Sequence, residues 1–344
     1  MLDVYHSCRG YGGPLIDMRG TIDLHLHSYP DLFPRLVDDL DVVEVARDAG
    51  MRALVLKCHH ENSVSRAYLV QRLVPEILVF GGIVLNSYVG GINPAAVEAA
   101  LRLGGKIVWM PTIDAAYHAQ VFGSTGRYDV QAGGRTSDSG IRVIDEAGRL
   151  IPALEEVLAL VVEHRAILGT AHLSPEEIFV LVKRAREAGV EKVVLTHPFF
   201  KVPGLDVDSV AELARMGAMP EFAYCTISPA WHHATPERIC EAIARVGASR
   251  CLLVSDSGQR HNPPAPEALR VFAQTLFEKG VDADDISLMV RENPAQLLEL
   301  DGERASPTAE ELAWAGAKRT GGDDSRPGAG DGNRAEEVSV RIES

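Results

Sequence analysis

Thr21-Ile22-Asp23-Leu24-His25-Leu26-His27 opens a series of eight short apolar runs in this chain of 344 residues. Its composition predicts a buried β-strand that ends in two histidines. Similar β-branched runs predict strands at 53–58, 79–85, 106–111, 166–172, 192–197, 218–224 and 251–256. Apart from one longer gap after 111, their starts lie about 30 residues apart, the length of one strand and helix. Apolar strands that alternate with helices indicate a parallel sheet covered by helices.

The segments between these strands carry helix signals. A helix over 41–49 ends at Gly50, and further helices begin at Ser174 and Thr235, each followed by a proline. Eight strands, each followed by a helix, predict an α/β fold of the (β/α)8 TIM-barrel class. The competing architecture is an open doubly wound sheet. It lacks support because no GxGxxG or GxxxxGK[ST] motif follows the first strand.

The predicted organisation has three parts: an N-terminal extension (1–20), one barrel domain (21–300) and a tail (301–344). An insertion at about 113–150, which combines a Gly/Ser/Thr-rich loop with a small hairpin turning at 146–148, follows the fourth strand. A loop at this position opens on the C-terminal face of a barrel, so we interpret it as a lid or pocket wall rather than an inert insertion. The tail has few large apolar residues and is expected to be mostly disordered.

Charge and cysteine content restrict the partners. Acidic residues outnumber basic ones 48 to 34, a formal net charge of −14, which argues against binding of nucleic acid. No apolar run approaches the ~20 residues of a membrane helix, and the N-terminus lacks the features of a secretory signal. The five cysteines form no CxxC pair, so a reduced, cytoplasmic setting is expected. The sequence leaves a homo-oligomer open.

Strong metal ligands lie at the ends of four predicted strands. His25 and His27 are two residues apart at the end of the first strand and therefore face the same side. The fifth, sixth and eighth strands end in His172, His197 and Asp256. All five lie on the face where barrel enzymes have their active sites, and imidazole and carboxylate suit Zn²⁺, Mn²⁺, Fe²⁺ or Ni²⁺. A hydrogen-bonded polar cluster without metal is the alternative, and it explains five such residues at strand ends less well.

This order of motifs resembles the amidohydrolase superfamily of metal-dependent hydrolases. The resemblance extends from about residue 20 to 300 and includes the segment ENPAQLL at 292–298. It implies that His25, His27, His172 and His197 are metal ligands and that Asp256 is a ligand or the general base. Many binuclear members carry a bridging lysine or glutamate at the end of the fourth strand, where this chain reads KIVWMPT (106–112). The resemblance therefore favours a branch with one divalent ion over a site with two. Zinc is the first candidate for this ion, and Mn, Fe and Ni stay open.

Further polar residues are expected around this metal. On the second strand, Lys57 and His59 share one face, and His59 ranks above His60 as a catalytic group. Lys57, His59 and Glu221, which lies inside the seventh strand, could also ligate a second ion. We interpret His59 as catalytic and assign substrate contacts to five residues on or after the strands: Lys57, Glu221, His118, His232 and Arg260.

The expected activity is hydrolysis of an amide, cyclic amide, lactone or ester-like bond in a small molecule. The metal would lower the pKa of a water molecule, and Asp256 would take its proton and return it to the leaving group. His59 or His197 would stabilise the oxyanion. Decarboxylases built on the same barrel give the alternative reaction, for which Lys57 and Arg260 would suit an anionic substrate. A metal-binding protein without catalysis is disfavoured because ligands from four strands leave open positions that face a pocket.

Overall fold

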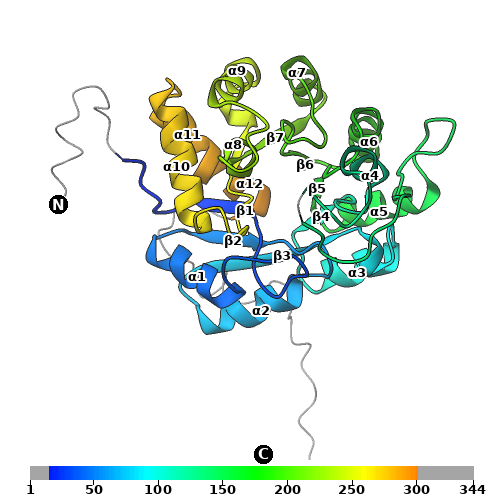
Figure 1. Ribbon diagram of the computed structural model, residues 1–344, viewed down its shortest axis with the longest axis horizontal. Helices are drawn as coiled ribbons and strands as arrows, with labels where there is room; N and C mark the ends of the chain where they lie inside the picture. The colour runs from blue at the N-terminus through cyan, green and yellow to red at the C-terminus, as the bar shows by residue number, and fades with distance from the viewer. Residues whose placement is uncertain (1–14, 130, 301–344) are drawn as a thin grey trace, which may run out of the picture.

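The computed structural model describes residues 15–129 and 131–300. Eight parallel strands follow one another in the order β1-β2-β3-β4-β5-β6-β7-β8. The carboxyl ends of β1 and β8 also meet, because Asp256 N donates to His25 O and His27 N donates to Ser257 O, both at 2.8 Å. Figure 1 shows the helices arranged outside these strands. The prediction of a (β/α)8 barrel is confirmed.

All eight predicted strands are present, and most are shorter than the sequence pattern suggests. The strands end before His27, His172, His197 and Asp256, which therefore lie in the loops that follow. The strands are β1 (Ile22–Leu26), β2 (Ala53–Leu56), β3 (Leu78–Val84), β4 (Ile107–Trp109), β5 (Ile167–Gly169), β6 (Val193–Thr196), β7 (Ala218–Ala223) and β8 (Leu252–Val254).

The helices begin and end largely where their capping residues predict. Ser174 Oγ accepts a hydrogen bond from Glu177 N, while Glu177 Oε2 accepts one from Ser174 N, so the two residues form a capping box. The helices are α1 (Asp39–Asp48), α2 (Val64–Leu73), α3 (Pro94–Arg102), α4 (Ala116–Phe122), α5 (Pro152–Glu163), α6 (Pro175–Ala188), α7 (Val207–Arg215), α8 (Tyr224–Ile227), α9 (Pro236–Val246), α10 (Ala265–Glu278), α11 (Ala283–Ser287) and α12 (Asn293–Leu298). Short helical turns are η1 (Ser87–Val89), η2 (Ala248–Arg250) and η3 (Leu288–Glu292).

A buried indole fills the inside of the barrel below the strand ends. Trp109, the last residue of β4, is 1% exposed. Glycines on the two neighbouring strands make room for it: a Cβ at Gly82 would lie 2.8 Å from Trp109 Cζ3, and one at Gly169 would lie 2.5 Å from Trp109 Cδ1. Trp109 therefore forms an apolar layer beneath the polar residues that follow the strands.

The chain between β4 and α5 contains α4 and a long loop. Gly133 N donates to Gly126 O at 2.9 Å, and Arg135 N donates to Tyr88 Oη at 2.8 Å, so this loop is tied to itself and to the segment after β3. The chain then turns at 145–149, where Ile144 and Leu150 form an antiparallel bridge. The predictions for residues 1–14 and for the tail at 301–344 lie outside the described residues. Within 15–129 and 131–300, none of the helices has the length and hydrophobicity to cross a bilayer.

Candidate metal centre and active site

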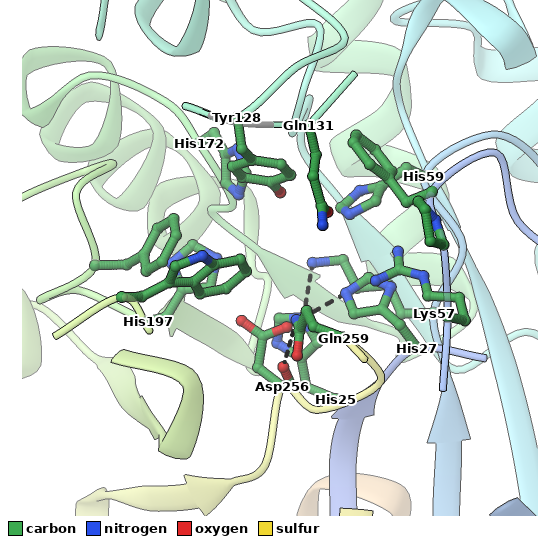
Figure 2. Close-up of a pocket in the computed structure, with 15 residues that line it drawn as sticks. His25, His27, Lys57, His59, Tyr128, Gln131, His172, His197, Asp256 and Gln259 are labelled. Atoms are coloured by element: carbon green, nitrogen blue, oxygen red, sulfur yellow. Dashed lines mark hydrogen bonds and ion pairs between the residues drawn. The ribbon is translucent and has the colours of Figure 1, made fainter. Parts of the chain in front are cut away.

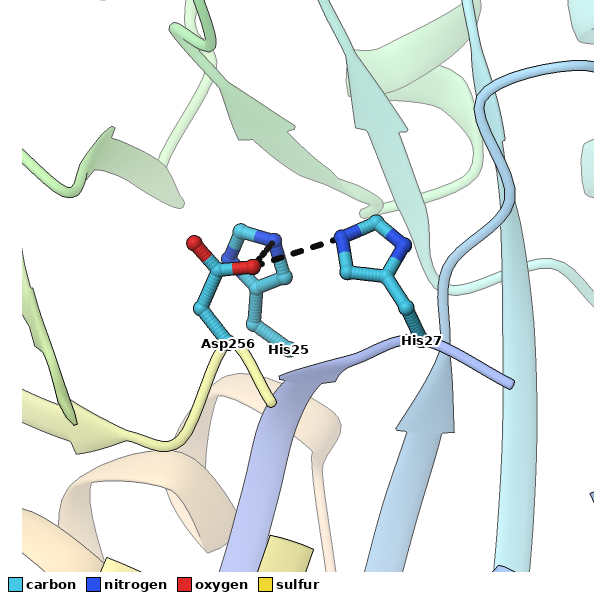
Figure 3. A group of neighbouring side chains, drawn as sticks. All are labelled: His25, His27 and Asp256. Atoms are coloured by element: carbon cyan, nitrogen blue, oxygen red, sulfur yellow. Dashed lines mark ion pairs between the residues drawn. The ribbon is translucent and has the colours of Figure 1, made fainter. Parts of the chain in front are cut away.

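Three of the predicted ligands converge at the C-terminal end of the barrel. Asp256 Oδ1 lies 3.2 Å from His25 Nε2 and 3.3 Å from His27 Nε2. One ligand atom from each residue lies within 4.8 Å of the other two, and all three residues are buried. Figure 3 shows the carboxylate of Asp256, which follows β8, directed toward the two imidazoles carried by β1 and the residue just after it.

His25 is held from behind by a second carboxylate. Its Nδ1 donates to Glu221 Oε1 on β7 at 2.8 Å. A neutral imidazole carries one N–H, so Nε2 then has a lone pair directed at Asp256 Oδ1. Two lone pairs 3.2 Å apart require a positive charge between them, either a proton or a cation. Burial lowers the pKa of His25, but the charges of Asp256 and Glu221 outweigh burial and raise this pKa.

Lys57 supplies one positive charge at the same place. Its Nζ lies 3.0 Å from His25 Nε2 and 5.2 Å from the centre of the Trp109 ring. Burial lowers the pKa of Lys57 to about 8, although the charges of Asp256 and Glu221 oppose this shift. The ammonium group therefore lies at the floor of the site, between the indole and the three converging residues.

Asp256 is positioned by its backbone and by a cysteine. Its φ of 42° lies in the left-handed region, which is uncommon for residues other than glycine and is frequent at functional sites. Cys225 Sγ donates to Asp256 Oδ2 at 2.8 Å, which leaves Oδ1 to the imidazoles. Burial alone would raise the pKa of Asp256, but the charges of His25 and His197 and the close approach of the His25 and His27 rings hold it well below its usual value.

His172 and His197 border the same cavity at a greater distance from the group of three. The ring centre of His197 lies 5.8 Å from that of His25 and 5.1 Å from that of His172. His197 has a φ of 27°, so two of the five predicted ligands have left-handed backbone. Burial lowers the pKa of His197 to about 3 and that of His172 well below its usual value. Both rings are therefore neutral at neutral pH and have a lone pair to offer.

The chemistry of these donors fits a divalent cation of the zinc type. Burial lowers the pKa of His27 to about 3 as well, so the neutral imidazoles of His27, His172 and His197 stand beside the ionised carboxylate of Asp256. Hydrogen bonds within the protein do not account for the whole cluster, because Nδ1 of His27 and Nδ1 of His197 are buried without a partner. Such orphaned atoms are costly in a purely structural polar cluster.

Aromatic rings and amides enclose the cavity above this cluster. Tyr128 and Trp231 stack with their ring centres 5.7 Å apart, and Figure 2 shows Gln131 and His59 on the opposite side of the opening from His197. The cavity is lined by His25, His27, Phe33, Pro34, Arg35, Lys57, His59, Tyr128, Gln131, His172, His197, Phe200, Trp231, Asp256 and Gln259.

The predicted substrate contacts divide into two groups. Lys57 lines the cavity, as does the predicted catalytic residue His59. The other four are not among the residues that line this cavity: Glu221, His118, His232 and Arg260. Glu221 lies behind His25, and His118 lies behind His172, where the two Nδ1 atoms are 2.8 Å apart. His232 and Arg260 are exposed.

His59 and its neighbour His60 face different surroundings, in agreement with the ranking made from strand alternation. His59 Nδ1 lies 2.8 Å from Thr112 Oγ1, which also accepts a hydrogen bond from Asn86 Nδ2 at 2.7 Å. His60 Nε2 donates to Gly133 O at 2.7 Å, and its Nδ1 lies 3.1 Å from Asp31 Oδ1. With Cys58, His60 and Asp31 form a second group of potential ligand atoms.

Sequence reasoning missed several lining residues and the partner of Asp256. Gln259 adjoins Arg260 in the chain, but alternation cannot decide which loop residue faces the cavity. Tyr128 and Gln131 belong to the insertion that was interpreted as a pocket wall, which was the available signal for them. The remaining missed residues had no such signal: Phe33, Pro34, Arg35, Phe200 and Cys225.

Comparison with solved structures places this fold in a known class. An amidohydrolase from Pseudomonas aeruginosa has a TM-score of 0.56 and 13% identity over 81% of this chain and 95% of its own. A proposed 2-pyrone-4,6-dicarboxylic acid hydrolase from Pseudomonas putida has a TM-score of 0.57 and 16% identity over 83% of this chain and 99% of its own. A dihydroxybenzoic acid decarboxylase from a Polaromonas species, with bound manganese and the inhibitor 2-nitroresorcinol, has a TM-score of 0.54. Its sequence identity is 11%, over 86% of this chain and 100% of its own.

The chain thus has the same barrel fold as these proteins, and the fold expected from the resemblance noted in the sequence is confirmed. It belongs to the family described as "Family of unknown function (DUF6282)", whose sequence profile matches residues 20–221. No curated protein sequence matches the chain.

Proposed function

We propose that this protein is a metal-dependent hydrolase of a small molecule with an amide, cyclic amide, lactone or ester-like bond. The observation that carries the proposal is the convergence of His25 Nε2, His27 Nε2 and Asp256 Oδ1 at the base of a lined cavity. His25, His27, His172, His197 and Asp256 would hold one divalent ion, with zinc as the first candidate. Trp109 favours one ion over two, because an indole closes β4 where a bridging side chain would be needed.

A divalent ion bound there would polarise a carbonyl oxygen and lower the pKa of water. Asp256 is the general base of the proposed reaction, since its carboxylate is ionised and its Oδ1 faces the cluster. Cys225 donates to Oδ2, and Oδ1 is the oxygen that faces the imidazoles. Asp256 then delivers the proton to the leaving group.

His59 is suited to stabilise negative charge that develops on the substrate. Thr112 Oγ1 accepts from Asn86, and its hydroxyl hydrogen is satisfied when it donates to His59 Nδ1. This arrangement leaves the N–H of His59 on Nε2, and the ring lines the cavity. His59 is thereby a hydrogen-bond donor for an oxyanion.

The cavity walls favour a small, planar and anionic substrate. Phe33, Tyr128, Phe200 and Trp231 offer ring faces and edges, and Lys57 carries positive charge, whereas Arg35 is already paired with Asp31. Aromatic side chains prefer to pack against flat ligands, and ammonium and guanidinium groups pair with carboxylates. A lactone or cyclic amide that carries a carboxylate combines these properties.

Decarboxylation is the second candidate, and the position of Lys57 favours it. Its Nζ lies 3.0 Å from His25 Nε2, where a substrate carboxylate could contact both the ammonium group and the proposed metal ligands. The manganese-containing decarboxylase of the same fold supports weighing this reaction beside hydrolysis. In this scheme no water is consumed.

The two reactions are separated by incubating the zinc- or manganese-loaded protein in ¹⁸O-labelled water. The substrates are a panel of carboxylated lactones, cyclic amides and aromatic acids. Hydrolysis inserts one ¹⁸O atom into the product, which mass spectrometry detects, and it releases no CO₂. Release of CO₂ without ¹⁸O in the organic product would support the decarboxylase. If the protein loaded with either metal converts no member of this panel, both proposed reactions are contradicted.

A further inference from the structure

His118 and His172 form a hydrogen-bonded pair in which both rings use Nδ1. The two Nδ1 atoms lie 2.8 Å apart, and the rings are 11° from parallel with centres 4.9 Å apart. This separation is too long for face-to-face stacking with the two nitrogens in contact, and it is typical of nearly coplanar rings joined edge to edge. One Nδ1 must therefore donate a proton and the other must accept it.

The other nitrogen of His118 decides which ring is the donor. His118 Nε2 lies 2.7 Å from Arg127 O, and a carbonyl oxygen can only accept. A neutral His118 therefore has its N–H on Nε2 and a lone pair on Nδ1. His172 must then carry its hydrogen on Nδ1, so that its Nε2 has a lone pair on the side of the ring away from His118. His172 lines the cavity, and Nε2 is the nitrogen whose lone pair it can offer to a metal ion there.

We propose that His118 is a positioning residue that fixes the Nδ1–H tautomer of His172 and so keeps His172 Nε2 available as a metal ligand. The chain of hydrogen bonds starts at the carbonyl of Arg127, in the segment whose next residue, Tyr128, lines the cavity. The insertion after β4 thereby determines the state of a side chain that follows β5. The consequence for the metal rests on the proposed function, whereas the hydrogen-bond chain does not.

Packing supports a fixed rather than a mobile imidazole at position 118. His118 is fully buried, and its ring contacts those of Phe122 and Tyr128 at centre distances of 4.6 and 5.3 Å. The backbone that presents Arg127 O is itself tied down, because Arg127 and Ala132 form an antiparallel bridge. Orienting partners of this kind raise the metal affinity of histidine ligands, and their loss typically lowers it about 10- to 100-fold.

The test compares two substitutions with opposite expectations. In H118Q, the amide NH₂ can donate to Arg127 O, and the amide oxygen can accept from His172 Nδ1. H118L fills the same space and offers neither group. H164Q serves as the matched control, because His164 lies outside the cavity.

Two readouts are needed, and the first is independent of metal. In metal-free, ¹⁵N-histidine-labelled protein, long-range ¹H–¹⁵N spectra report the tautomer of His172, assigned by loss of its signals in H172Q. We expect Nδ1–H in the wild type, H118Q and H164Q, and a shift toward Nε2–H in H118L. An Nε2–H tautomer or a doubly protonated ring at His172 in the wild type would overturn the proposal, and so would an unchanged tautomer in H118L.

The second readout is the affinity for Zn²⁺, measured by competition with a chromophoric chelator. We expect a 10- to 100-fold loss in H118L and a change of less than about 3-fold in H118Q and H164Q. Equal losses in H118L and H118Q would overturn the positioning role. If the wild type binds no Zn²⁺ but the His172 tautomer still shifts in H118L, the proposed function is refuted and the hydrogen-bond chain stands. The wild-type spectrum decides the tautomer even if H118L does not fold.

Discussion

Glu221 Oε1 accepts a hydrogen bond from His25 Nδ1 at 2.8 Å, and both side chains are buried. A carboxylate behind an imidazole fixes the tautomer of the ring and makes its other nitrogen a stronger ligand. The strand pairing explains why these residues meet, because β7 runs beside β8, and the carboxyl end of β8 adjoins that of β1. The glutamate predicted as a substrate contact is thus a hydrogen-bond partner of His25 in the structure.

Replacement of Glu221 by glutamine should weaken metal binding without unfolding the protein. The amide oxygen can still accept from His25 Nδ1, but it carries no charge, so we expect a 10- to 100-fold lower affinity for Zn²⁺. Chelator competition measures this affinity. The matched control is E237Q, which removes an exposed ion pair with Lys279 and should have little effect. Equal affinities for E221Q and the wild type would contradict the role of Glu221.

Replacement of Asp256 by asparagine should abolish most of the turnover. Asparagine keeps an oxygen that can ligate a metal, but it cannot take a proton, so kcat should fall by about 10²- to 10⁴-fold. Steady-state kinetics and metal content are to be measured on the same samples, with the exposed Asp208 changed to asparagine as control. A D256N protein with bound metal and full turnover would exclude Asp256 as the general base.

The pair formed by His60 and Asp31 should make stability depend on pH. Burial alone would lower the pKa of His60, but the Asp31 carboxylate, whose Oδ1 lies 3.1 Å from His60 Nδ1, raises it from 6.5 to about 9. Because the pKa of His60 is raised in the folded protein, its protonation stabilises the fold. This stabilisation is complete below pH 6.5 and is lost as the pH rises through 9. The shift corresponds to at most about 3 kcal/mol in the free energy of unfolding.

Urea titrations between pH 6 and 10 check this prediction. The free energy of unfolding should fall over this range in the wild type and in H164Q. It should change less in H60Q, whose amide can still donate to Gly133 O but cannot become charged. Parallel profiles for the wild type and H60Q would show that His60 does not carry the pH dependence.

The fold was predictable from the sequence because its signals are local. Each strand is a short apolar run, and helix starts such as Ser174-Pro175 contain their own capping groups. Residues at strand ends were also accessible to this reasoning, since the face of a parallel barrel that they occupy follows from topology. His25, His27 and Asp256 were found in this way, and the structure brings them together.

The surroundings of these residues could not be predicted, because they depend on the paths of loops. Gln259 lines the cavity and the adjacent Arg260 does not, a difference that no alternation rule covers outside a strand. Cys225 reaches Asp256 only because α8 begins directly after β7. His118 was expected at the substrate, but its helix, α4, turns the imidazole toward His172 instead.

The most direct test of the account is the metal stoichiometry of the purified protein, measured by isothermal titration with Zn²⁺ after chelation and dialysis. The account predicts one tightly bound ion per chain in the wild type, and loss of that ion in a variant with alanine at both His25 and His27. A wild type that binds no divalent ion, or a double variant that binds it as tightly as the wild type, would contradict the proposed metal centre.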